Sequence, residues 1–76
     1  MPTYRIHVIN SDFKAEEERD CSNIQAAAKH ALKGALEIGS EQVLNGETFF
    51  GAEVRIRDGN ETALRFLVTV GSSPLQ

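Results

Sequence analysis

Residues 50–70 read FGAEVRIRDGNETALRFLVTV and consist of two alternating segments around Asp58-Gly59. Apolar side chains occupy every second position of both segments, from Phe50 to Ile56 and from Leu64 to Val70. Because successive side chains of a strand point to opposite faces of its sheet, each segment is predicted to be a strand with one buried face. Asp58-Gly59 is typical of a tight turn between paired strands. The stretch therefore predicts an antiparallel hairpin.

A second hairpin is predicted at the start of the chain. Residues 3–9 alternate in the same way, with Tyr4, Ile6 and Val8 on one face, and residues 10–12 form a cluster of turn residues. Residues 13–19 are predicted to return as a weaker strand that contains the glutamates of positions 16–18. A solvated edge strand explains this charge, because charged side chains protect an edge from pairing with other chains.

Between the hairpins the sequence predicts one helix. Ser22-Asn23-Ile24-Gln25 matches a capping box with Ser22 as the N-cap, and an alanine-rich segment follows. The apolar residues fall on one broad stripe at helical spacing. We expect the main helix to end near Ile38 with Gly39 as its cap, and residues 40–44 to form an extra turn.

These elements predict a two-layer α+β fold, β-β-α-β-β, with one helix packed on a four-stranded sheet. The helix crossover favours the strand order 2-1-4-3, which is β-grasp-like, with the first and last strands parallel. An all-antiparallel order is the alternative. We expect residues 1–70 to form the single domain and residues 71–76 to form a flexible tail.

Composition narrows the class of protein. The chain has 76 residues and a formal charge of −3, which disfavours nucleic acid and anionic membranes as partners. Its single cysteine, Cys21, excludes an internal disulfide and fits a reducing compartment. The chain shows no signal peptide pattern and no apolar run long enough to cross a membrane, so we expect a cytoplasmic protein.

Three short motifs resemble a known family. They are Met1-Pro2-x-Tyr4-x-x-x-Val8, Asn23-Ile24-x-Ala26-Ala27 and Val54-x-Ile56-x-Asp58-Gly59. In this order and spacing, over roughly residues 1–70, they resemble a family of short bacterial domains of unknown function. The resemblance implies the same fold and a bacterial cytoplasm, and it brings no activity or active-site residue.

The candidate binding residues lie on the sheet face opposite the helix. By parity this face receives four of the five arginines of the chain, one histidine and two apolar residues. The set is Arg5, His7, Ile9, Arg55, Arg57, Arg65 and Leu67. One interpretation is an anion-binding surface, because guanidinium groups bind phosphate through paired hydrogen bonds. The other is that Glu16, Glu18 and Glu53 pair with these arginines across the strands.

Two functions stay open at this point. The favoured one is a non-catalytic protein-interaction module that binds itself or another protein through the outer sheet face or an edge strand. The alternative is weak binding of nucleic acid or another anionic ligand by the arginines. We expect no catalytic residues, no metal site and no cofactor, because no nucleophile–base pair and no metal-ligand spacing can be assembled.

Overall fold

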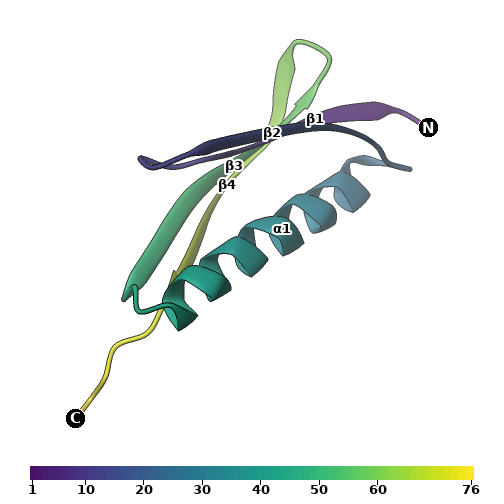
Figure 1. The fold of residues 1–76 in the computed structure, drawn as a ribbon. Coiled ribbons are helices and arrows are strands. Elements are labelled where there is room, and N and C mark those ends of the chain that lie inside the picture. Colours follow the sequence, from purple (N-terminus) through teal and green to yellow (C-terminus); the bar gives the residue numbers. More distant parts are fainter.

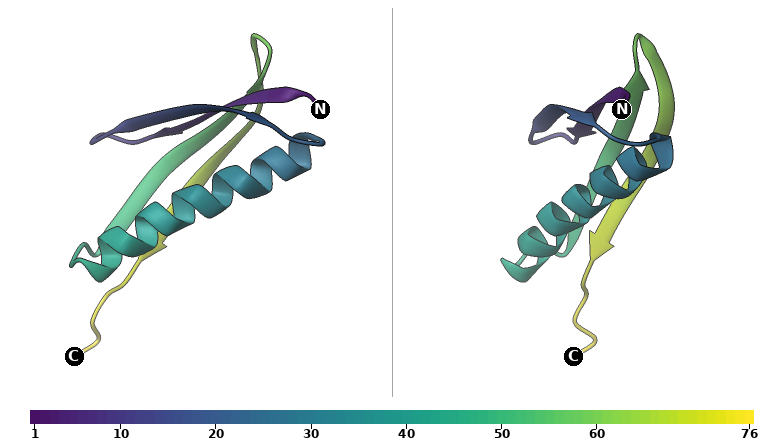
Figure 2. Two further views of the ribbon diagram at one scale, coloured as in Figure 1. Left: turned by 45° about the vertical axis from the view of Figure 1, so that its right-hand side comes forward. Right: turned by 90° about the vertical axis from the view of Figure 1, so that its right-hand side faces the viewer.

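The computed structural model describes all residues, 1–76, and shows a helix lying on one face of a four-stranded sheet (Figure 1). The elements follow the predicted β-β-α-β-β sequence. They are β1 (Thr3–Ile9), β2 (Lys14–Asp20), α1 (Ile24–Leu44), β3 (Phe49–Asp58) and β4 (Glu61–Gly71). Two further views show that α1 covers only one side of the sheet (Figure 2). The α+β class and the two layers are therefore confirmed.

The strand order differs from the favoured prediction. The sheet runs β2-β1-β3-β4, and all three pairings are antiparallel. The order 2-1-4-3 was wrong, and the all-antiparallel alternative is the one observed. Burial explains why β3 takes the central place, since Val54 and Ile56 are fully buried whereas Leu64 and Phe66 of β4 are only partly buried.

The core lies between α1 and the sheet face formed by the predicted apolar positions. On β1 and β3, Ile6 is opposite Ile56 and Val8 is opposite Val54. From the helix side, buried alanines meet this surface: Ala27, Ala28, Ala31 and Ala35. Because alanine side chains are short, the helix axis can lie close to the strands.

Both ends of the helix differ from the prediction. Asn23, rather than Ser22, is the N-cap, and its Oδ1 accepts a 2.9 Å hydrogen bond from the Ala26 N–H. The helix does not end at Gly39 but continues without a break to Leu44. Its end coincides with Asn45 and with Gly46, which has a positive φ of 111°.

Gly39 has a packing role instead of a capping role. A Cβ atom at this position would lie 2.6 Å from Phe50 Cδ2 and 2.8 Å from Val70 Cγ2, well inside van der Waals contact. Gly39 is therefore a point where α1 closely approaches β3 and β4. The prediction that Gly39 caps the helix is therefore wrong, because the glycine serves packing within the helix.

We expect Gly39→Ala to destabilise the fold by about 1–3 kcal/mol, because the added methyl group overpacks the helix–sheet contact. Gly34 of the same helix is the matched control, since a Cβ there meets nothing within 4 Å. Gly34→Ala should stabilise by about 0.4–1 kcal/mol through the unfolded chain. Urea unfolding followed by circular dichroism measures both changes, and equal stability of the two variants would contradict this role of Gly39.

Candidate functional site

The outer face, meaning the sheet surface opposite α1, brings the predicted arginines together on neighbouring strands. Arg5 is directly opposite Arg57, and Arg55 is directly opposite Arg65. Like charges in directly opposed positions repel each other and destabilise a sheet. Carboxylates that pair with these arginines would therefore offset the repulsion on this face.

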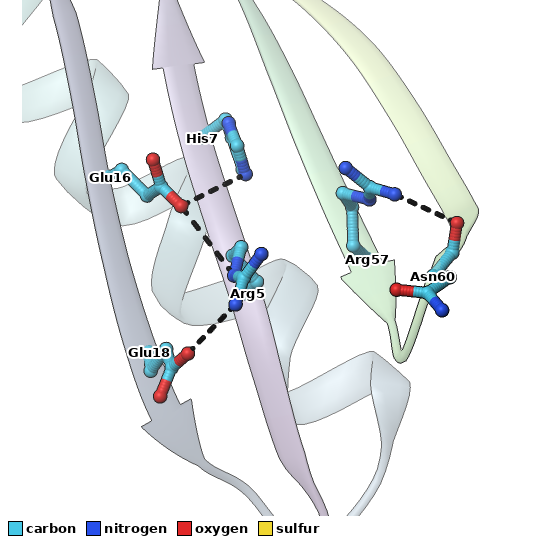
Figure 3. A network of polar contacts seen from close by, with 6 residues as sticks. All are labelled: Arg5, His7, Glu16, Glu18, Arg57 and Asn60. Atoms are coloured by element: carbon cyan, nitrogen blue, oxygen red, sulfur yellow. Dashed lines mark hydrogen bonds and ion pairs between the residues drawn. The ribbon is translucent and has the colours of Figure 1, made fainter.

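Glutamates of β2 supply part of the negative charge that pairs with these arginines. The Arg5 guanidinium lies 3.0 Å from a Glu18 carboxylate oxygen and 3.5 Å from one of Glu16 (Figure 3). Both carboxylates are well exposed, so each pair contributes at most about 1 kcal/mol. Arg5 is nevertheless held toward β2 and is turned away from Arg57.

Glu53 supplies the negative charge beside Arg55 and Arg65. Its two carboxylate oxygens lie 2.8 Å from Arg55 Nη2 and 2.8 Å from Arg65 Nη2. Hydrogen bonds from Arg65, and next from Arg55, lower the pKa of Glu53 from 4.5 to about 2. The pairing predicted for Glu16, Glu18 and Glu53 is thus observed for three of the four arginines.

Arg57 and His7 have no carboxylate hydrogen-bond partner. Arg57 donates through Nη2 to the Asn60 carbonyl at 2.7 Å, which ties it to the β3–β4 turn (Figure 3). His7 is only 7% exposed, and neither of its ring nitrogens has a hydrogen-bond partner. Burial is the main cause that lowers the pKa of His7 below its ordinary value, and the Glu16 carboxylate, 3.7 Å away, opposes this shift. A partner on this face would meet arginine side chains before it reached His7.

The two apolar residues of the outer face do not form a continuous patch. Ile9 and Leu67 are both directly opposite Glu53, one on each side of it. Leu67 is 77% exposed whereas Ile9 is partly buried. The expected apolar centre is therefore divided by a carboxylate that is itself paired with two arginines.

The largest apolar surface lies elsewhere, between α1 and β4. A groove of about 990 Å³ runs along this side of the molecule, which we name the α1–β4 groove. Its apolar lining consists of Ala28, Leu32, Leu36, Leu44, Leu64 and Phe66. Leu36 and Leu44 are 46% and 85% exposed. Sequence reasoning missed this groove because it assigned the apolar helix stripe to the sheet and placed β4 inside the sheet.

The two edges of the sheet differ strongly in charge. Edge strand β2 reads KAEEERD, and all seven of its residues are exposed. Edge strand β4 is longer, at 11 residues, and between Thr62 and Gly71 it has Arg65 as its sole charged side chain. Charges protect β2 from pairing with another chain. Edge strand β4, which borders the α1–β4 groove, has a register shift between Thr62 and Leu64 but no comparable charges along the rest of its length.

The structure holds no cluster of three or more histidine, cysteine or acidic side chains placed to bind a metal ion. Cys21 is a free thiol buried in the core. His30 of α1 contacts Glu17 of β2 at 2.7 Å. No helix combines the length and the apolar character that a membrane span requires.

The geometry defines a small α+β domain with a four-stranded antiparallel sheet and a single covering helix. The chain belongs to the family described as Domain of unknown function (DUF6894), whose model matches residues 3–69. The expectation of a short domain of unknown function is thereby confirmed. The comparisons with curated proteins and with solved structures gave no match.

The lowered pKa of Glu53 predicts a defined pH dependence of stability. Because the pKa of Glu53 is about 2 in the folded chain against an ordinary 4.5, its stabilising effect is present above pH 4.5 and is lost as the pH falls toward 2. Wild type and Glu53→Gln should therefore differ in urea midpoint at pH 7 and converge near pH 2.

Carbon-detected NMR titration of the Glu53 carboxyl group tests the cause directly. In the variant Arg65→Gln, which removes the strongest hydrogen-bond donor to Glu53, the pKa of Glu53 should rise toward 4.5. An unshifted pKa in that variant would show that Arg65 does not hold the carboxylate.

Proposed function

We propose that this domain is a non-catalytic protein-interaction module that self-associates through edge strand β4 and the α1–β4 groove. We name these two features together the docking surface. The observation that carries the proposal is the pairing of a long, nearly uncharged edge strand with an open apolar groove along its side. A second copy of the chain would cover both features at once.

Backbone and side chains support this function in different ways. The free edge of β4 offers unpaired N–H and C=O groups to a partner strand, which is the basis of recognition by strand addition. The leucines of the groove supply apolar area that is exposed in the single chain. Interfaces of this kind combine an apolar centre with a polar rim.

The outer face has less support as a binding surface. Three of its four arginines are already held by glutamates, and Arg57 is bonded to its own turn. Nucleic-acid binding by Arg5, Arg55, Arg57 and Arg65 would have to break these contacts. We therefore place self-association on the docking surface, and we propose the cytoplasm as its location because the buried free thiol of Cys21 suits a reducing compartment.

Substitution of Leu36 tests the docking surface. We expect Leu36→Glu to raise the dissociation constant of the dimer at least about 100-fold, or ~2.7 kcal/mol, because the interface would have to bury a carboxylate. The fold of the single chain should be kept, since Leu36 is already 46% exposed there. Sedimentation equilibrium over a concentration series measures the change.

Phe49→Glu is the matched control, because Phe49 is 64% exposed and lies on β3, outside the docking surface. It should leave the dissociation constant unchanged. A wild-type chain that sediments at 8.3 kDa at every concentration would refute self-association. Dissociation by Phe49→Glu but not by Leu36→Glu would place the interface on the outer face instead.

A further inference from the structure

Four charged side chains form a regular row on the side of α1 that lines the groove. They are Lys29, Lys33, Glu37 and Glu41, and all four border the α1–β4 groove. Residues four apart lie above one another on a helix, so the row shares one face. The row is basic in its first half and acidic in its second half.

Nothing within the chain uses these charges. All four side chains are exposed, and the six ion pairs of the structure include none of them. Within the row each lysine precedes a glutamate by four or eight positions, and lysine followed by glutamate is the weaker orientation of a helical pair. The pattern therefore contributes little to the stability of the isolated helix.

Edge pairing of β4 restricts how two copies can meet. A two-fold axis perpendicular to the sheet makes two β4 strands antiparallel, and it extends the sheet from one copy into the other. Because α1 lies on one face of the sheet in each copy, the same axis places both helices on the same face (Figure 2). The two helices then lie side by side and antiparallel.

The charge row matches this symmetry. Lys29 and Glu41 lie at equal distances in sequence from Ala35, and so do Lys33 and Glu37. When two antiparallel helices cross near Ala35, Lys29 of each copy faces Glu41 of the other, and Lys33 faces Glu37. Parallel helices would instead place each lysine against its own counterpart, where like charges repel.

We propose that the partner of this domain is a second copy bound about such a two-fold axis, with β4 strands antiparallel and four lysine–glutamate pairs between the helices. The proposal rests on the self-association proposed above and adds its geometry. Leu32 and Leu36 of both copies occupy the centre of the interface, and the charge row forms its rim. The rim allows one orientation and excludes the parallel one.

Charge reversal tests this geometry with the full chain. K29E/K33E makes the row wholly acidic, and E37K/E41K makes it wholly basic. Like charges then face each other in a dimer of either variant. Each variant alone should therefore dimerise at least about tenfold more weakly than wild type. An equimolar mixture should form a heterodimer tighter than either homodimer. Native mass spectrometry distinguishes the three dimers by mass.

The fourfold reversal K29E/K33E/E37K/E41K is the matched control, because it inverts every charge but keeps the row self-complementary. It should dimerise about as strongly as wild type, which also shows that reversal by itself does not prevent folding. Wild-type affinity in both single-sign variants, or a mixture that forms no heterodimer, would overturn the antiparallel geometry. If Leu36→Glu still dissociated the dimer in that case, self-association through the groove would stand without the antiparallel geometry. A monomeric wild type would refute both the self-association and its geometry.

Discussion

The width of a single helix determines how this molecule is arranged. A helix with its side chains is about 10–12 Å wide, whereas four strands spaced by about 4.8 Å span more than that. α1 therefore covers β3 and β4 and reaches β1, and it leaves β2 with little cover. The close contact at Gly39 fixes the helix over β3 and β4. The exposed, charged β2 follows from this shortage of cover, whereas the groove lies where α1 borders the edge strand β4.

The outer face shows how a sheet can carry many arginines whose charges are mostly paired within the chain. Arginines stand directly opposite one another at two places on adjacent strands, an arrangement that is unfavourable alone. Glu16 and Glu18 of β2 and Glu53 of β3 pair with three of these four arginines. The arginine–glutamate pairs of this face thus stabilise the contacts between neighbouring strands. The docking surface differs, because its charges are unused within the chain and its apolar groups are uncovered.

Local patterns in the sequence predicted most of the fold. Alternation alone placed the buried face of β1 and β3, and it also placed the glutamates that pair with arginine. Two errors have physical causes. Gly39 was interpreted as a helix cap because a glycine needed for close packing looks the same in sequence as one needed for a turn. The strand order was wrong because both orders keep the same strand directions and differ only in whether β3 or β4 lies beside β1. The groove could not be predicted, since it depends on β4 being an edge strand and on residues such as Leu44 that lie beyond the expected helix end.

The central claim is that a second copy covers β4 and the α1–β4 groove. An isotope-filtered NOE experiment on a mixture of labelled and unlabelled chains tests it most directly, since only contacts between copies give signals. We predict signals between the copies from the Leu36 methyl groups and between Hα atoms across paired β4 strands, with none from Phe49 on β3. Signals between copies that arise only from the outer face, or tumbling of an 8.3 kDa monomer with no such signals, would contradict the claim.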